Sequence, residues 1–173
     1  MSAVLNFFRP KRWAERITEI DPAELRARGI RGAIVDLDNT LVGFRSLAPL
    51  EEDAAWVGRA RDAGVRVAVL TNNSTPWAAG VAKDLGVPCI PRARKPLPHG
   101  FRRATKVLEL QPNEVVVIGD QLFTDVLGAK LAGLDVILVD PLVRHDPWNT
   151  RPLRWLERAV LRGVPRGLAR RGR

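Results

Sequence analysis

Short apolar runs that alternate with segments of helical spacing constrain the fold of this chain more than any other feature. Runs of four to six residues match buried parallel strands, which are apolar on both faces, and the segments between them are long enough for crossover helices. The sequence therefore predicts an α/β fold, a doubly wound parallel sheet of five strands. The expected strands are residues 30–35, 65–70, 87–90, 114–118 and 135–139, and the expected helices are residues 22–28, 49–63, 76–85, 98–110 and 125–132.

The 173 residues suit one compact domain with three parts. We expect an apolar and basic N-terminal segment with a short helix over residues 1–29. The sheet and its helices follow over residues 30–148, and a basic amphipathic tail occupies residues 149–173. The sequence shows no repeats and no long linker of low complexity.

The few cysteines and histidines narrow the possible metal sites. Cys89 is the one cysteine, and His99 and His145 are the two histidines. These numbers exclude an internal disulfide framework and a multi-cysteine zinc site. Any metal must be held mainly by carboxylates, which favours Mg²⁺. We interpret Cys89 as a packing residue and both histidines as surface residues.

Charge is concentrated near the C-terminus. The net charge is +9, and residues 151–173 hold eight arginines against one glutamate. Such a tail predicts contact with a polyanionic surface, either nucleic acid or anionic lipid, and a solvated tail is the alternative. No apolar run approaches the roughly 18 residues that a membrane-spanning helix needs, and the N-terminus lacks a basic leader and a cleavage pattern. We therefore expect a cytoplasmic protein.

Both ends of the chain have the pattern of a membrane-surface segment. In the tail, arginines recur every three or four residues opposite leucines and valines, which predicts an amphipathic helix over residues 152–162. Near the N-terminus, Phe7, Phe8 and Trp13 interleave with basic residues. We expect these ends to hold the protein peripherally on the inner face of the cell membrane. The alternative is that the aromatic rings and the tail helix pack on the core.

Polar residues gather at the predicted ends of three strands and at the entry to one helix. Ligands of such sheets bind beyond the carboxyl ends of the strands, so we expect these residues to meet in one crevice. Asp36-Leu37-Asp38-Asn39-Thr40 follows the first strand, Thr71-Asn72 the second, Lys95-Pro96 precedes the fourth helix, and Gly119-Asp120 with Thr124-Asp125 follows the fourth strand. In order and composition these groups resemble the four motifs of the haloacid dehalogenase (HAD) superfamily. A lone Asp-x-Asp pair would have turn capping as its alternative.

The resemblance implies a phosphatase in which Asp36 attacks phosphorus and becomes an aspartyl phosphate. Asp38 would protonate the leaving oxygen and then activate the water that hydrolyses the intermediate. Mg²⁺ held by Asp36, the Asp38 backbone carbonyl, Asp120 and Asp125 would offset the repulsion between two anions.

Cationic and amide donors complete the implied site. The Thr71 hydroxyl and the backbone amides of Leu37 and Asn72 would hold phosphoryl oxygens. Lys95 would pair with Asp36 and the phosphoryl group, unless it is an exposed lysine at a helix start. Asp125 would hold a metal-bound water or orient Lys95, and helix capping is its alternative. Three arginines flanking the crevice are candidates for a second anionic group of the substrate, or are solvated surface residues: Arg45, Arg92 and Arg94.

The motif spacing leaves no room for the separate cap domain that covers the site of many HAD enzymes. Asp36 and Thr71 are 35 residues apart, and Thr71 and Lys95 are 24 apart. A turn and one helix fill the first gap, and one helix and a short strand fill the second. A capless, open site suits a phosphate on a large molecule, namely a lipid headgroup, a nucleic-acid end or a protein.

A closer resemblance is to the bacterial YqeG family, and it extends over about residues 9–145. The residues that carry it are Arg9-Pro10 and residues 20–22, 28–32, 36–42 and 118–129. That family is similar to mitochondrial phosphatases that remove the terminal phosphate of phosphatidylglycerophosphate. The resemblance implies a lipid-phosphate phosphatase that forms phosphatidylglycerol. A phosphatase for nucleic-acid ends or a soluble phosphometabolite is the alternative, and a non-catalytic binding protein on the same scaffold is a second one.

Overall fold

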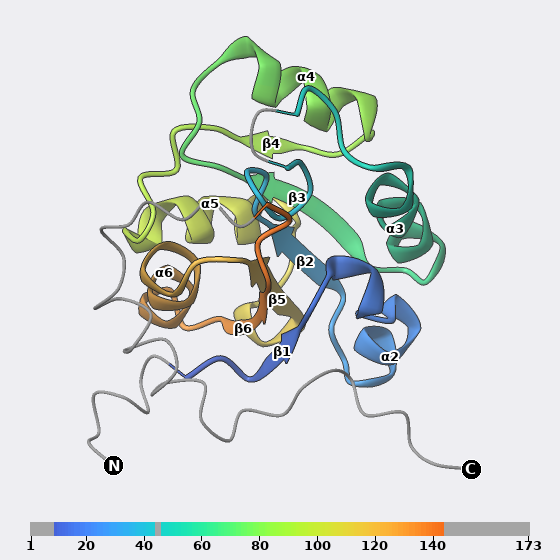
Figure 1. Ribbon diagram of the computed structural model, residues 1–173. Helices are drawn as coiled ribbons and strands as arrows, with labels where there is room; N and C mark the ends of the chain where they lie inside the picture. Colours follow the sequence, from blue (N-terminus) through green and yellow to red (C-terminus); the bar gives the residue numbers. More distant parts are fainter. Residues whose placement is uncertain (1–8, 44–45, 144–173) are drawn as a thin grey trace.

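A computed structural model of the chain describes residues 9–43 and 46–143, and its centre is one parallel sheet (Figure 1). The sheet has six strands in the order β1-β6-β5-β2-β3-β4, and every neighbouring pair is parallel. The strands are β1 (Arg12–Ala14), β2 (Gly32–Val35), β3 (Arg66–Leu70), β4 (Cys89–Ile90), β5 (Val115–Gly119) and β6 (Asp135–Val139). The doubly wound α/β prediction is confirmed.

Helices cover both faces of the sheet (Figure 1). The α-helices are α2 (Pro22–Ala27), α3 (Glu51–Asp62), α4 (Pro76–Asp84), α5 (Pro98–Val107) and α6 (Leu127–Leu131), and single turns form η1 (Ile17–Glu19), η2 (Pro112–Glu114) and the π-helical η3 (Leu122–Val126). One apolar cluster joins one face of the sheet to α2, α3 and α4, and a second joins the other face to α5 and α6. The fold therefore has three layers.

The alternation along β2 shows how the sheet separates these clusters. Ala33 and Val35 belong to the first cluster, whereas Ile34 between them belongs to the second, and all three are fully buried. Successive side chains of a strand point to opposite faces, so a strand covered on both sides must be apolar throughout. Burial of the strands on both faces therefore explains the continuous apolar runs of the sequence.

The sixth strand, β1, was not among the expected strands. It pairs with β6 in parallel register, from Arg12 opposite Ile137 to Ala14 opposite Val139. Its three residues include a charged one at a sheet edge, and so they lack the apolar run that revealed the other strands. The segment expected to precede the core thus supplies an edge strand and buried core residues: Ala14, Ile17, Ile20 and Leu25.

Of the three aromatic residues expected at a membrane surface, Trp13 is the one that lies within the described residues. Trp13 packs against the second apolar cluster, and its Nε1 donates a hydrogen bond to Asp140 Oδ1 at 2.7 Å. Trp13 is therefore bound to the core, as the alternative interpretation had it. Phe7, Phe8 and the tail helix expected over residues 152–162 lie outside the described residues. Within the described ranges, no helix combines the length and apolarity needed to cross a membrane.

Candidate active site

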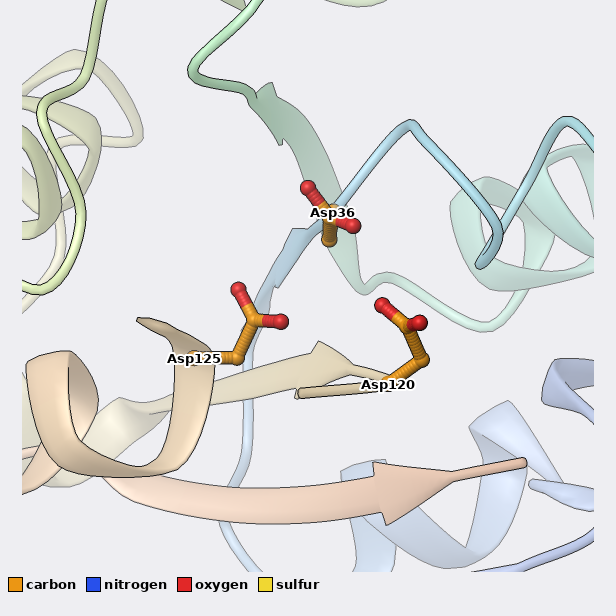
Figure 2. A group of neighbouring side chains, drawn as sticks. All are labelled: Asp36, Asp120 and Asp125. Carbon is orange, nitrogen blue, oxygen red and sulfur yellow. The ribbon is translucent and has the colours of Figure 1, made fainter. Parts of the chain in front are cut away.

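The catalytic edge, as we call the edge of the sheet formed by the carboxyl ends of the strands, gathers the predicted motifs. Asp36 directly follows β2, Thr71 follows β3, and Asp120 follows β5. Because β3, β2 and β5 are parallel neighbours, their ends lie side by side. Asp125 reaches the same place from the η3 turn, and Figure 2 shows its carboxylate directed toward those of Asp36 and Asp120.

Three carboxylates and one ammonium form the centre of this edge. Asp36, Asp120 and Asp125 each offer an oxygen within 4.8 Å of the others. Lys95 Nζ lies 2.5 Å from Asp36 Oδ1 and 2.7 Å from Asp125 Oδ1. Asp36, Asp125 and Lys95 are all buried. Lys95 is thus fixed between two carboxylates, not exposed at a helix start.

The electrostatics of the cluster show an excess of negative charge. Burial raises the pKa of the Asp36 carboxyl well above its ordinary value; Lys95 opposes this, and Asp125 and Asp120 add to it. Burial, followed by the charge of Asp125, raises the pKa of Asp120 to about 7. Burial alone would lower the pKa of Lys95, but its two carboxylate partners outweigh burial and raise it. One ammonium does not balance three carboxylates, two of them buried.

A divalent cation fits this group. Carboxylate oxygens are hard ligands, which suit Mg²⁺, and two further positive charges would balance the cluster that Lys95 leaves unbalanced. Asp36, Asp120 and Asp125 are the side chains that would hold it. The Asp38 carboxylate lies outside this cluster, and a metal contact through the Asp38 backbone carbonyl stays a prediction.

Asp38 is held by Thr71 instead. The Thr71 hydroxyl donates to Asp38 Oδ2 at 2.8 Å and accepts from the Asn73 backbone N–H at 2.9 Å. Thr71 is fully buried, whereas Asp38 is exposed. The hydroxyl expected to hold a phosphoryl oxygen therefore orients the Asp38 carboxylate in this structure. Its phosphoryl contact stays a prediction.

The positioning roles of two residues, Asn72 and Thr40, were not predicted from the sequence. The Asn72 side chain clamps the Lys95 backbone: its Oδ1 accepts from Lys95 N at 2.7 Å and its Nδ2 donates to Lys95 O at 3.2 Å. The Thr40 hydroxyl donates to Asp120 Oδ1 at 3.4 Å. The final threonine of the Asp-x-Asp-x-Thr motif was the signal for Thr40, whereas the sequence had suggested only a backbone role for Asn72.

Asp125 sits within a π-helical turn that begins earlier than the predicted helix. The turn spans Leu122–Val126, and Asp125 Oδ2 accepts from the Gln121 backbone N–H at 3.2 Å. Its other oxygen accepts from Lys95. Asp125 thus accepts hydrogen bonds both from the backbone at the start of this turn and from the Lys95 ammonium. It therefore combines the capping and orienting roles considered for it.

Gly119 makes room for Asp125, and replacing it by alanine is expected to lower kcat about 100-fold. A methyl group at this position would lie 2.4 Å from Asp125 Cγ and 2.6 Å from its Oδ2. The carboxylate would have to shift, and a displacement of about 1 Å in an active site costs on the order of 10²-fold in rate. Hydrolysis of an aryl phosphate measures the effect. Gly58→Ala, whose methyl group meets nothing within 4 Å, is the control, and equal rates for both variants would contradict this role of Gly119.

The remaining residues singled out from the sequence differ in burial, and two of them lie outside the described residues. Leu37 is buried between Asp36 and Asp38, while Arg92 and Arg94 are exposed and have positive φ angles of 52° and 55°. No contact shows a substrate role for either arginine. Arg45 and His145 lie outside the described residues, and His99 is exposed as expected. Cys89 packs against the first apolar cluster, which confirms its packing role.

Comparisons with known proteins identify relatives of this chain. Residues 5–133 match the model of the family described as haloacid dehalogenase-like hydrolase. The chain is 38% identical over 160 residues to the Bacillus subtilis protein named Probable phosphatase YqeG, covering 92% of this chain and 93% of that one. It is 29% identical over 154 residues to phosphatidylglycerophosphate phosphatase 1 of Arabidopsis thaliana, covering 83% of this chain but 44% of that relative.

A solved structure shows the same fold. The cobalt-bound form of the deoxy-D-mannose-octulosonate 8-phosphate phosphatase of Haemophilus influenzae has a TM-score of 0.54 and 16% sequence identity, and the match covers 79% of this chain and 90% of that one. The acidic cluster stands at the catalytic edge of this fold, and the family match extends over the residues that form it. The chain belongs to the haloacid dehalogenase-like hydrolase family, and within that family it is a phosphatase.

Proposed function

We propose that the chain is a Mg²⁺-dependent phosphomonoester hydrolase that works through an aspartyl phosphate on Asp36. The observation that carries this proposal is the Lys95 ammonium fixed between Asp36 and Asp125, beside the Asp120 carboxylate. Bound Mg²⁺ would supply the positive charge that lets an anionic phosphate approach these carboxylates. Lys95 keeps the Asp36 carboxylate in place, because it binds one of its two oxygens and leaves the other for attack.

Two proton transfers complete the reaction. In the first step, a new bond joins Asp36 to phosphorus while the bond to the leaving oxygen breaks, and Asp38 gives its proton to that oxygen. In the second, Asp38 takes a proton from water, which attacks phosphorus and releases phosphate from Asp36. Asp38 suits this double role because its exposed carboxylate is oriented by Thr71 and lies apart from the three clustered carboxylates.

We infer that the substrate is a lipid phosphate, with phosphatidylglycerophosphate as the specific candidate. The similarity to the Arabidopsis phosphatase of that name supports this choice. So does the open site: the described residues between Asp36 and Thr71 form α3 and β3 with their loops, and those between Thr71 and Lys95 form α4 and β4 with their loops. A lipid headgroup at a surface needs such an opening.

Exposed apolar side chains around the catalytic edge support the same inference. Leu47 is 83% exposed, Leu97 is 52% exposed and Val143 is 40% exposed. Each stands in a segment that follows the carboxyl end of a strand, and the exposed Arg92 and Arg94 follow β4. Apolar groups beside cations suit the headgroup region of an anionic membrane. We propose peripheral attachment through this edge at the inner face of the cell membrane.

A substrate panel tests this function. With Mg²⁺ present, kcat/KM for phosphatidylglycerophosphate in anionic vesicles is expected to exceed that for a 5′-phosphorylated oligonucleotide or a sugar phosphate by at least about tenfold, and EDTA should abolish all three reactions. Raised salt should slow the vesicle reaction but not aryl phosphate hydrolysis, because salt screens surface attraction.

Matched leucine variants locate the membrane contact. Leu47→Ser should slow the vesicle reaction, whereas Leu131→Ser, which alters a 45% exposed leucine on α6, should not. The aryl phosphate reaction should be the same for both variants. Preference for the oligonucleotide or the sugar phosphate over the lipid would overturn the lipid assignment and leave the phosphatase mechanism intact.

A further inference from the structure

A hollow of about 560 Å³ opens at the edge of the sheet opposite the catalytic edge. Its wall includes Arg31, directly before β2, and Arg66, the first residue of β3. Asp36 lies at the other end of β2, four residues beyond Gly32, or about 13 Å away. A small ligand in this hollow therefore cannot also contact the acidic cluster.

Four arginines line the hollow, and none of its lining residues is acidic. Arg31 Nη1 lies 3.1 Å from Glu114 Oε1, and Arg66 Nη1 donates to the Leu108 carbonyl at 2.7 Å. Each contact fixes one end of a guanidinium and leaves its other N–H groups for a ligand. The other two arginines, Arg26 and Arg61, make no side-chain hydrogen bond or ion pair with any residue that the structure describes.

The dipoles of helix ends account for the positions of only two of these four arginines. Arg26 and Arg61 stand in the last turns of α2 and α3, where the helix dipole favours a cation. Arg31 and Arg66 stand at strand starts, where no such dipole acts. Two glutamates outside the lining pair with these arginines: Glu114 with Arg31, and Glu109, whose Oε2 lies 3.5 Å from Arg66 Nη1. The pKa of Glu114 is lowered by the Gln111 backbone N–H together with Arg31 and Arg26. Two carboxylates against four arginines leave a net positive hollow, which an anion would stabilise.

The rest of the wall sets the kind of anion. Valines and a leucine line the hollow between the arginines, among them Val57, Val87, Val107 and Leu108. Sites with a mainly apolar wall and a few fixed polar groups bind organic molecules, and the volume lies in the range of such sites. We propose that this hollow binds a small organic anion of nucleotide size, with two or more phosphate or carboxylate groups on an apolar body.

Calorimetric titration with ATP tests the site. EDTA removes Mg²⁺ and so prevents turnover, and about 150 mM salt screens diffuse attraction to the surface. ATP should bind more tightly than tripolyphosphate, which lacks the apolar body, and more tightly than adenosine, which lacks the charge. The double variant Arg26→Gln/Arg61→Gln should bind ATP at least about tenfold more weakly, because charge-assisted hydrogen bonds are lost. Its aryl phosphate hydrolysis should equal that of the parent.

Arg59→Gln is the matched control, since Arg59 is an exposed arginine on α3 that does not line the hollow. It should bind ATP like the parent. Amide shifts in an NMR titration give the location: Gly64 and Gly86, which line the hollow, should shift, and Asn72 and Asp120 should not. Equal loss of ATP binding in the double variant and in Arg59→Gln, or shifts confined to the catalytic edge, would overturn the proposal. Neither result bears on the phosphatase reaction.

Discussion

Asp36→Asn is expected to abolish hydrolysis of an aryl phosphate, with a fall in kcat on the order of 10⁴-fold or more. An amide cannot form the acyl phosphate, so the first step loses its nucleophile. The folded state should persist, because Asp36 is buried among carboxylates that repel it and Lys95 keeps Asp125 as a partner. Steady-state kinetics measure the loss, and thermal unfolding in EDTA checks that the variant is folded.

Asp62→Asn provides the comparison for this experiment. Asp62 is an exposed carboxylate at the end of α3 and belongs to none of the motifs. It should keep the activity of the parent. Near-parental hydrolysis by a folded Asp36→Asn protein would show that another group attacks phosphorus.

Asp38→Asn is expected to separate the two steps of the reaction. With a nitrophenyl phosphate, the leaving group needs no proton, so Asp36 can still attack. The asparagine cannot take a proton from water, so hydrolysis of the aspartyl phosphate should fall by a factor on the order of 10²–10⁴. Rapid mixing should show a burst of about one nitrophenolate per enzyme, and mass spectrometry should find the added phosphoryl group on Asp36.

The double variant Asp36→Asn/Asp38→Asn is the control, and it should give neither a burst nor a phosphorylated protein. Two results would contradict the assignment of Asp38. One is steady turnover by Asp38→Asn at the rate of the parent, and the other is a phosphoryl group found on a residue other than Asp36.

The central strands could be predicted from the sequence because their burial leaves a direct mark on it. A strand such as β5 is covered on both faces and is apolar at every position. The edge strand β1 leaves no such mark, since Arg12 is only half-buried and the strand has three residues. The start of η3 was also missed, because a π-helical turn has no sequence pattern that distinguishes it from the α-helix that follows.

The candidate site could be predicted as a set of residues but not as a set of contacts. Strand ends and motif order brought Asp36, Asp120, Asp125 and Lys95 together correctly. The bond from Thr71 to Asp38 and the clamp of Asn72 on Lys95 depend on side-chain directions between distant segments. Local spacing contains no information about such directions.

The position of β1 has a consequence for how the protein forms during synthesis. Lys11, beside β1, pairs with Asp135, the first residue of β6, across a sequence separation of 124 residues. β1 therefore stays without its neighbour in the sheet until nearly all of the described chain has been translated. Contacts of such long range slow folding, because closing a large loop has an entropic cost. The central pair β2 and β3, by contrast, can form early, so the strand that leads into Asp36 is paired well before the outer edge of the sheet closes.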